Sequence, residues 1–577
     1  MLFVAFLVSS LCLARGYCGR IGGFQQGDLP VRNLDTGRSY STIQAAIDAP
    51  ETLDGHEISV ASGVYYEQVV VDKSLSLIGA DRSTTVIDGG GEGRVIYVVA
   101  DRVEVRDFTI QHGNVGLWLD NSSHSRIVGN MLQYGSYGLR LYHSGNSEVL
   151  HNEVRGFAWF GVELRSSGNC TLRENRLLDN EYNFGVNGDV LSDFINDIAA
   201  SNTVNGRPIR YLIGQEDITI DSSTFDEVGY LALVNCAHVE VRDLEVRENV
   251  QGVLFAFTAD STVSNVYASG NWNGIYAVHS SKISVGGCRA NSNFDYGIKF
   301  FNSSRSIARG NNVDDNGWAG LGVFGSSDSI IEDNEANFNT YNLHLVYTND
   351  SVITRNRALG RPGEGTSYSI AVYYSHNNLI YHNSFANSLL HVEIRNGTSF
   401  VPSNRWDSGV EGNYWSLYGG VDADHDGIGD TTHVIGLNNT DAYPLMGQFS
   451  EFSVTVDEEP HTVSVISNST ISQFQFGVDD ESLSFKATGA LGTIGFLRLA
   501  VSSGFLQDGG GTDLSVLVNG EPPEMKRTWK DESRTYFYFS YVNAVADPGI
   551  VPWVVVVVAS VSVIVFLLVF WSFRRER

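Results

Sequence analysis

The chain has 577 residues and a formal net charge of −28, from 38 basic and 66 acidic residues. This excess of negative charge disfavours nucleic-acid binding, because contacts to phosphate groups need clustered Lys and Arg. The 60 glycines, 26 tyrosines and 30 phenylalanines, with only 4 methionines, are typical of an all-β protein that is rich in turns.

Residues 1–16 have the features of a secretory signal peptide. An apolar stretch, MLFVAFLVSSLCLA, is followed by Arg15 and Gly16, so that Ala14 and Gly16 form a small-x-small cleavage pattern. No basic residue precedes the apolar stretch, which leaves an uncleaved anchor or a misassigned start as alternatives. We expect the chain that follows to be exported.

Residues 38–100 are expected to form an N-terminal cap and the first coils of a repeat structure. The segment STIQAAIDA, residues 41–49, places Ile43, Ala46 and Ile47 on one face of a helix that begins behind a Ser or Thr. Such a helix can cover the open end of a stack of strands, where unpaired strand edges would otherwise be exposed.

Residues 101–400 contain a repeat of 22 or 23 residues. Apolar residues alternate within each repeat, and Ser, Asn and Gly lie between them, which is the pattern of short strands separated by turns. Stacking of such repeats predicts an all-β fold, a right-handed parallel β-helix with one continuous core. The glycines that begin the repeats are Gly116, Gly138, Gly161, Gly229, Gly252, Gly274, Gly297 and Gly320.

Asparagines recur in the same register as the glycines. We expect their amide side chains to form hydrogen-bonded ladders between successive coils rather than to bind a ligand. An irregular insertion near residues 189–226 interrupts the repeat, and we expect it to project from one side and to border a groove. The predicted ladders are Asn130, Asn152 and Asn175, and Asn249, Asn271, Asn293, Asn316 and Asn339.

Four residues in the later repeats are candidates for catalysis. Hydrolysis of a polysaccharide needs two carboxyl groups about 5–10 Å apart, and the local candidates are Asp295, Asp314 and Asp315. For a lyase, Lys299 is the candidate base. Solvated turns explain the same residues, so the catalytic residues remain unassigned and enzyme activity remains open.

Aromatic residues at repeat starts and corners favour glycan binding, because rings stack on sugar faces while Asn and Asp bind hydroxyl groups. Packing within the rod is the alternative for each of them. The residues are Trp118, Trp159, Trp272, Trp318, Tyr137, Tyr276, Tyr296 and Tyr373.

Seven Asn-x-Ser/Thr sequons are candidate glycosylation sites in an exported chain. A sequence rich in Asn and Ser generates such sequons by chance, so their occupancy is a hypothesis. The sequons begin at Asn121, Asn169, Asn302, Asn349, Asn396, Asn438 and Asn468.

The acidic segment VDADHDGIGD, residues 421–430, lies within a predicted C-terminal cap, residues 405–446. Its aspartates alternate with other residues, as in loops that bind Ca²⁺ through about six to eight oxygen atoms. His433 stands where an EF-hand has its bidentate Glu, so no EF-hand is predicted. We expect a structural Ca²⁺ that fastens the end of the rod, with a solvated acidic turn as the alternative. The predicted ligands are Asp422, Asp424, Asp426, the Ile428 carbonyl and Asp430.

Two further segments end the chain. Residues 451–545 show strands of period two around a VNGEPP turn and are expected to form a small β-sandwich-like domain. Residues 549–573 are uncharged and long enough to cross a hydrocarbon core of about 30 Å as a transmembrane helix. The arginines of residues 574–577 predict a cytoplasmic tail, and hence an extracellular chain between signal and helix.

Several segments carry a resemblance to a known family: YSTIQAAID, SGVYYEQVVVDKSLSLIGA, NTVNGRPIRYLIGQEDITI, GNYWSLYGGVDADHDGIGDTTHVI and DAYPLM. With the repeats they cover about residues 38–446. They resemble the pectin-lyase-like β-helix superfamily, especially the NosD-like surface proteins of archaea and bacteria in the carbohydrate-binding and sugar-hydrolase group. The resemblance implies the fold but leaves the activity open, because the superfamily includes lyases, hydrolases, epimerases and adhesins.

The sequence therefore predicts a membrane-anchored extracellular protein that binds, or binds and processes, extracellular or cell-envelope polysaccharide. A structural surface-layer or adhesive rod, with lateral contacts to other surface proteins, is the alternative. A copper-accessory role, which the family name suggests, is disfavoured because histidines are dispersed and methionines are few.

Overall fold

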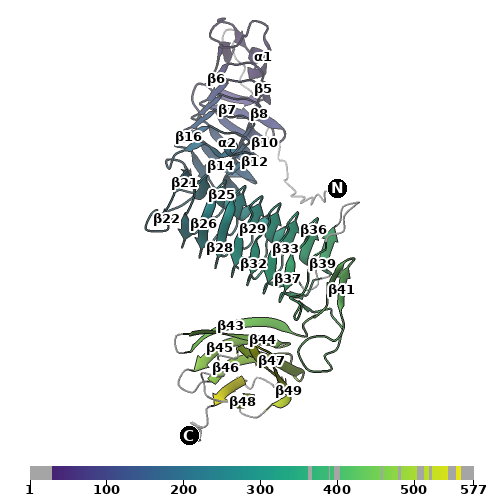
Figure 1. Ribbon diagram of the computed structural model, residues 1–577. Coiled ribbons are helices and arrows are strands. Elements are labelled where there is room, and N and C mark those ends of the chain that lie inside the picture. The colour runs from purple at the N-terminus through teal and green to yellow at the C-terminus, as the bar shows by residue number, and fades with distance from the viewer. Residues whose placement is uncertain are drawn as a thin grey trace, which may run out of the picture.

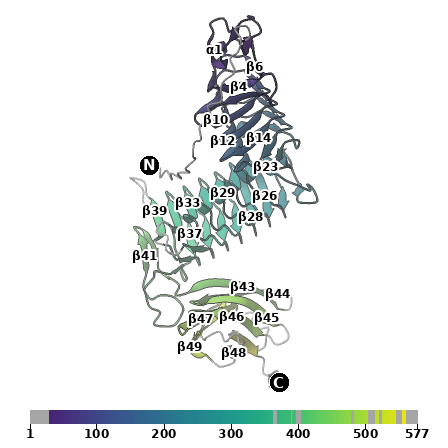
Figure 2. The same cartoon turned by 180° about the vertical axis from the view of Figure 1, so that it is seen from behind.

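The computed structural model describes nine stretches of the chain, and within them almost all regular structure is β-strand, with two short helices. Two stacks of parallel coils meet at an angle, and antiparallel sheets that follow the end of the second stack in sequence lie alongside that stack (Figure 1; Figure 2). We call residues 29–204 the first rod and residues 207–415 the second rod. The described residues are 29–361, 367–388, 390–395, 403–456, 459–477, 482–502, 513–518, 523–543 and 554–559.

The helix predicted near the N-terminus is present. Helix α1 (Ile43–Asp48) begins after Thr42, whose side chain accepts a hydrogen bond from the Ala45 backbone N–H at 3.1 Å. Ile43, Ala46 and Ile47 are fully buried, as the spacing of the apolar residues predicts, and they join the core of the first rod. The helix therefore closes the open end of that core.

The first rod has three faces, and its strands pair in parallel with the equivalent strands one coil away. The exceptions are the antiparallel pairs that β1 makes with β2 and β3, and that β20 makes with the first strand of the second rod. One face contains β1 (Val31–Asn33), β2 (Ser39–Tyr40), β3 (Glu57–Val60), β6 (Ser76–Gly79), β9 (Glu104–Arg106), β11 (Arg126–Val128), β13 (Glu148–Leu150), β16 (Thr171–Arg173) and β19 (Asp197–Ile198). The other two contain β4 (Gly63–Tyr66), β5 (Val69–Val71), β7 (Thr85–Asp88), β8 (Arg94–Val98), β10 (Thr109–Asp120), β12 (Met131–Tyr142), β14 (Glu153–Phe157), β15 (Phe160–Arg165), β17 (Arg176–Leu178), β18 (Tyr182–Asn187) and β20 (Thr203–Val204).

The second rod repeats the three-sided arrangement with its own core, because residues 22 or 23 apart pair in parallel, as in Val253 with Ile275 and Ile275 with Ile298. Its long face, sheet C, contains β21 (Arg207–Ile213), β23 (Tyr230–Val234), β25 (Gln251–Ala256), β27 (Asn273–Val278), β29 (Tyr296–Phe301), β31 (Ala319–Phe324), β33 (Tyr341–Val346), β36 (Tyr368–Tyr373) and β39 (Leu390–Arg395). The other faces contain β22 (Thr219–Ile220), β24 (Glu240–Arg242), β26 (Ala259–Ser264), β28 (Ser281–Gly286), β30 (Ile307–Arg309), β32 (Ile330–Glu332), β34 (Val352–Thr354) and β37 (Leu379–Tyr381), and β35 (Arg357–Leu359), β38 (Ser384–Ala386) and β40 (Tyr414–Trp415).

Both predicted asparagine ladders are confirmed. The backbone N–H of each asparagine except Asn339 donates to the side-chain oxygen of the equivalent residue in the next coil, at 2.9 Å from Asn130 to Asn152 and 2.7 Å from Asn316 to Asn339. The Asn339 N–H donates to the Asn342 side chain at 3.1 Å and ends the ladder. The ladder residues are buried, so each amide satisfies a backbone group that water cannot reach. A third ladder, absent from the predictions, joins Asn311, Asn334, Asn356, Asn383 and Asn413.

The bend between the rods lies where the predicted insertion interrupts the repeat. After β18 the chain forms helix α2 (Leu191–Phe194) and a coil of short strands before it enters β21. Strand β18 contacts the start of β25 in the second rod through two hydrogen bonds. The Val250 N–H donates to the Phe184 carbonyl at 2.9 Å, and the Gln251 side chain donates to Asn187 at 2.9 Å. The insertion therefore redirects the stack and places outer faces of both rods beside one another.

Two antiparallel sheets follow a hairpin at the end of the second rod, and they share one cluster of buried side chains that includes Val463, Leu483, Leu497 and Phe539. The hairpin is β41 (His433–Gly436) and β42 (Asn439–Asp441). The first sheet contains β43 (Gln448–Val456), β44 (Glu459–Ser467), β47 (Ile494–Ser502), β49 (Glu524–Lys530) and β50 (Arg534–Val542), and the second β45 (Thr470–Gly477), β46 (Ser482–Thr488), β48 (Asp513–Val518) and β51 (Val554–Ala559).

The predicted signal peptide and most of the predicted transmembrane helix lie outside the described residues. Within the predicted helix, Val554–Ala559 is described, and it forms strand β51, which pairs with β46 and β48. A run of valines favours a strand as strongly as an apolar helix, because branching at Cβ suits the pleated backbone. Across the described stretches, we find no helix with the length and apolar character needed to cross a membrane.

Candidate functional site

A cleft with a volume of about 310 Å³ lies at the bend between the rods. Alternation along the strands aims its side chains outward: on β27, Ile275 and Ala277 enter the core and Tyr276 points away from it. The parallel register then sets Tyr276 beside Lys299 on β29. The polar and aromatic lining includes Phe160, Glu163, Arg165, Asn187, Asp189, Trp272, Asn273, Tyr276, Asp295, Lys299 and Phe301.

Asp295 and Lys299, both predicted as candidates, lie together in this cleft. The Lys299 Nζ is 3.8 Å from an Asp295 carboxylate oxygen, and it lies 4.4 Å from the centre of the Tyr296 ring. Burial raises the pKa of Asp295, while the charge of Lys299 and the Trp272 side chain act in the opposite direction. Burial likewise lowers the pKa of Lys299, against the effect of Asp295.

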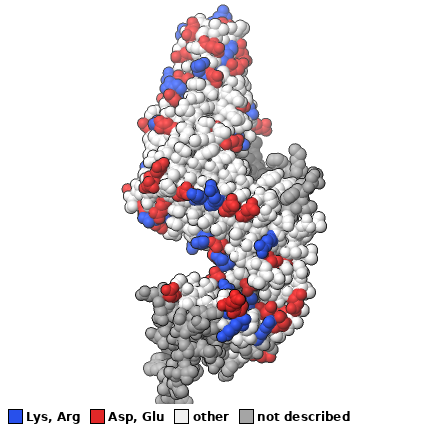
Figure 3. Space-filling view, in the orientation of Figure 1, with Lys and Arg blue, Asp and Glu red and all other residues white. Residues whose placement is uncertain are grey.

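The remaining charges of the cleft are balanced. Glu163 is almost fully buried and pairs with Arg140 at 2.8 Å, one coil earlier on the same face. Asp189 and Arg165 are exposed at the rim. Figure 3 shows that acidic and basic side chains are also interspersed over the wider surface, on the face drawn.

The predicted aromatic residues divide between packing and the cleft, except that Trp318 is 44% exposed away from the cleft. Trp159 and Trp272 lie on different rods with ring centres 5.4 Å apart, so they help to hold the bend together. Tyr296 and Tyr373 are buried in an aromatic cluster on the outer surface of sheet C. Trp272 and Tyr276 remain partly exposed and line the cleft.

Asp314 and Asp315 do not line the cleft. The Asp314 carboxylate accepts hydrogen bonds from the Asn337 backbone at 2.7 Å and from the Asn312 side chain at 2.8 Å. Asp315 has a positive φ of 56° at a corner and pairs with Arg361 at 2.6 Å. Both aspartates therefore stabilise corners of the rod, and the structure does not pair them with Asp295.

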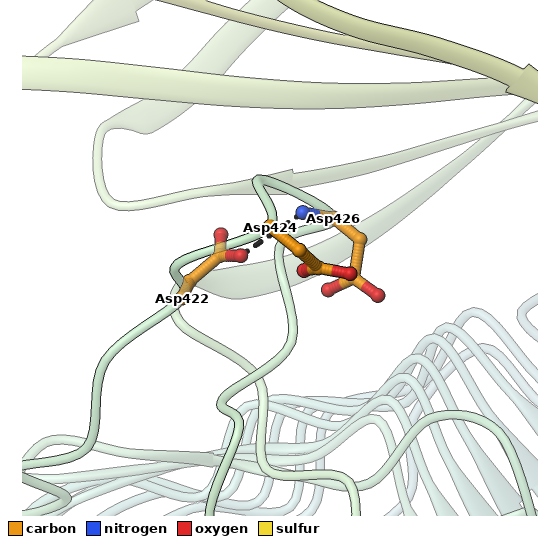
Figure 4. A group of neighbouring side chains, drawn as sticks. All are labelled: Asp422, Asp424 and Asp426. Atoms are coloured by element: carbon orange, nitrogen blue, oxygen red, sulfur yellow. Dashed lines mark hydrogen bonds between the residues drawn. The ribbon is translucent and has the colours of Figure 1, made fainter.

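The acidic loop brings three of its predicted ligands together. One carboxylate oxygen from each of Asp422, Asp424 and Asp426 lies within 4.8 Å of the others, and this is the only such acidic, His or Cys group of three in the described stretches. Figure 4 shows the carboxylates of Asp424 and Asp426 side by side, with Asp422 bonded to the Asp426 backbone. Asp430 instead accepts a hydrogen bond from the Ala423 N–H at 2.8 Å.

The same loop contacts the antiparallel sheets. Arg527 on β49 pairs with Asp424 at 2.7 Å, and the His425 ring lies 5.4 Å from that of Tyr538 on β50. Burial raises the pKa of Asp426, and the charges of Asp424 and Asp422 raise it further, while a hydrogen bond from the Ile428 N–H lowers it. Three carboxylates this close together repel one another, and a divalent cation bound between them would offset that repulsion.

A buried ionic contact beside the loop was not predicted. Glu411, at the end of the second rod, binds His382 at 2.7 Å and also pairs with Arg498 on β47. Glu411 and Arg498 are separated by 87 residues and belong to no repeat, so nothing in the sequence pattern linked them. Phe160 and Glu163 were not predicted for a related reason. They lie on the first rod, and only the bend brings them beside Asp295 and Lys299 of the second rod.

Six of the seven sequons are described, and Asn396 lies outside the described residues. Five asparagines, Asn121, Asn169, Asn302, Asn438 and Asn468, are exposed, and Asn349 is half-buried. The first four of these five have positive φ values, a backbone conformation that Asn adopts more readily than most residues. The positive φ at these positions therefore accounts for the asparagines without a glycan. Occupancy of the sequons by glycans stays a prediction.

Stacked parallel coils, capped by a helix and bent around a lined cleft, define a β-helix protein. The chain belongs to the family described as "Periplasmic copper-binding protein (NosD)", whose model matches residues 80–210 and 211–420. It is also 33% identical over 119 residues to a "Cell surface glycoprotein" of Methanothermus fervidus, a match that covers 21% of this chain. The matched segment spans 20% of that relative's length.

Two solved structures are similar in fold. One is the A-module of mannuronan C-5 epimerase AlgE4 from Azotobacter vinelandii, with 17% identity, a TM-score of 0.20, and 63% of this chain and 94% of that chain covered. The other is the tailspike protein of E. coli bacteriophage HK620 in complex with pentasaccharide, with 11% identity, a TM-score of 0.28, and 90% and 91% covered. Values this low carry no information about the site.

The copper in the family's description does not fit the side chains that the structure brings together. Copper ions prefer imidazole and sulfur ligands, whereas the one group of three potential ligands in the described stretches is made of carboxylates. The three described cysteines are buried, and burial raises the pKa of each thiol, which disfavours the thiolate that binds metal.

Proposed function

We propose that this is an extracellular surface protein that binds polysaccharide in the cleft at the bend. The observation that carries the proposal is the combination of partly exposed rings, Trp272 and Tyr276, with the Asp295 and Lys299 pair in one cleft. Rings bind sugar faces, and carboxylate, amine and amide groups bind hydroxyl groups. The similarity to a cell surface glycoprotein supports the location.

Replacing Tyr276 with alanine is expected to weaken glycan retention about tenfold, because the variant loses ring stacking but keeps the core residues on either side. Retention of the purified protein on immobilised neutral and uronic polysaccharides measures the effect, and assay of new chain ends in the same samples detects cleavage. Tyr267→Ala is the matched control, since that exposed ring lies outside the cleft lining.

Unchanged retention by Tyr276→Ala, with loss in Tyr267→Ala, would move glycan binding away from the cleft. Binding to none of the polysaccharides would favour the alternative, a structural or adhesive rod. New chain ends that disappear in Asp295→Asn would make the cleft catalytic.

We also propose that the antiparallel sheets form a β-sandwich that spaces the rods from a membrane, and that residues 549–573 cross this membrane once Val554–Ala559 leaves its pairing with β46 and β48. The shared apolar cluster of the two sheets supports the sandwich. The uncharged composition of residues 549–573 supports the anchor, with the tail in the cytoplasm.

We propose that Ca²⁺ binds Asp422, Asp424 and Asp426, aided by the Ile428 carbonyl and Asp430, and fastens the second rod to the sheets. Removal of Ca²⁺ by a chelator is then expected to lower the melting temperature by about 5 °C, because an ion that binds only the folded state stabilises it. Differential scanning calorimetry measures the shift.

Asp424→Asn is expected to abolish the Ca²⁺-dependent part of the shift. Asp328→Asn is its control, because Asp328 is an exposed aspartate at a corner of the second rod, where Asn also fits the positive φ of 56°. The readout is the response to Ca²⁺ rather than absolute stability, since Asp424 also pairs with Arg527. An equal response in Asp424→Asn and the unaltered protein would refute the Ca²⁺ site.

A further inference from the structure

The cleft contains polar atoms whose hydrogen-bonding capacity the described protein does not use. The Lys299 ammonium group contacts aromatic rings and has a carboxylate oxygen at 3.8 Å, but makes no hydrogen bond to the described residues. The Oδ1 atom of Asn273 also has no partner there, although the residue is only 6% exposed. Buried polar groups are normally paired, so the Asn273 oxygen indicates a ligand that supplies the missing partner. The Lys299 side chain is 19% exposed, so its ammonium group can donate to a ligand in the cleft.

The charge of the cleft limits what that ligand can be. Asp295 faces Lys299, Glu163 is paired with Arg140, and the exposed Asp189 and Arg165 have opposite signs. The cleft therefore has no net charge, within a protein whose net charge is −28. Nothing in this arrangement attracts a polyanion, either at long range or in the cleft.

A ligand carboxylate at Lys299 would compete with Asp295 for the same ammonium group. Binding would crowd two negative charges together at a partly buried position, which is unfavourable. A hydroxyl group meets no such obstacle, because it can accept a hydrogen bond from Lys299 and donate one to Asp295 or to the Asn273 oxygen.

We propose that the cleft selects an uncharged, hydroxyl-rich sugar unit and discriminates against uronate units. This inference rests on the proposed glycan-binding function and specifies its substrate class. The sugar ring lies on Tyr276, Lys299 donates to its hydroxyl oxygens, and Asp295 and Asn273 accept from its hydroxyl groups.

Titration calorimetry on the purified protein tests the proposal with gluco-, manno- and galacto-oligosaccharides and with mannuronate and galacturonate oligomers of equal length. We expect at least one neutral oligomer to bind at least tenfold more tightly than any uronate oligomer. Its Kd should change less than twofold between low and high salt, because no net charge is neutralised. Lys299→Met should weaken this binding at least tenfold, and Lys282→Met, which removes an exposed lysine paired with Asp260, should leave it unchanged.

Asp295→Asn provides a second test that keeps the shape of the side chain. It removes one negative charge beside Lys299, so uronate binding should become at least tenfold tighter than in the unaltered protein. Tighter binding of uronates than of neutral oligomers by the unaltered protein, weakened by salt, would overturn the inference and leave the glycan-binding function standing. Binding of no oligomer and no polysaccharide would overturn both.

Discussion

Replacing Glu411 with glutamine is expected to destabilise the junction between the second rod and the antiparallel sheets by about 3–5 kcal/mol, because it leaves a buried charge without its partner. The Arg498 side chain is 2% exposed and pairs with Glu411, which also binds His382 at 2.7 Å. Urea unfolding, followed by tryptophan fluorescence, measures the change in the free energy of unfolding. Glu335→Gln is the matched control, since this exposed carboxylate lies 3.9 Å from Arg357 and should contribute less than about 1 kcal/mol.

The pH dependence gives an independent check of the same contact. Burial alone would raise the pKa of Glu411, but the hydrogen bond from His382 and the charge of Arg498 lower it to about 2. A carboxyl group with a lowered pKa stabilises the folded state above its unfolded pKa of 4.5, and this stability is lost as the pH falls toward 2. The loss should be about 3 kcal/mol and should be absent from Glu411→Gln. Parallel pH profiles for the two proteins would contradict the assignment.

Asn316→Ala is expected to destabilise the second rod by about 2–5 kcal/mol, because several buried backbone and side-chain groups lose their partners at once. The Asn316 oxygen accepts from the Asn293 backbone at 2.9 Å, and its amide group donates to the Val313 carbonyl at 2.9 Å. Urea unfolding of the purified protein measures the loss.

The control for the ladder is Asn265→Gly, at an exposed corner with a φ of 50°. Glycine tolerates this backbone conformation, so removal of an exposed amide should change stability by less than about 0.5 kcal/mol. Equal effects of the two substitutions would mean that the ladder contributes no more than a surface asparagine.

The repeated part of the fold could be predicted because equivalent residues of successive coils recur at a fixed spacing in the sequence. Asn316 and Asn339 are 23 residues apart in the sequence and hydrogen-bonded in the structure, so the period alone identified the ladder. The same signal was present, and overlooked, for Asn311 and Asn334. Ile43, Ala46 and Ile47 were predicted correctly for a similar reason, because helical spacing defines which face is buried.

The cleft and the junction could be predicted only in part. Asp295 and Lys299 were predicted separately, as a hydrolase carboxylate and as a lyase base, and their pairing was not predicted. The three aspartates of the acidic loop were predicted because their spacing is local. The positions of Glu163 at the cleft and Arg498 at the junction depend on how the chain runs between and beyond the repeats. The period of the repeat does not predict that path. The valine run at residues 554–558 is compatible with both a strand and a helix, so the sequence alone did not distinguish the two.

The bend at the insertion has a consequence for how such proteins change in size. Coils on either side of it pair in a register of 22 or 23 residues, as in Leu117 with Leu139 in the first rod and Val253 with Ile275 in the second, so duplication or deletion of one such coil preserves the ladders. A gain of one coil near α1 would lengthen only the first arm, and one near β33 only the second. Because the bend itself is untouched in both cases, the reach of each arm can vary independently while the cleft between them stays the same.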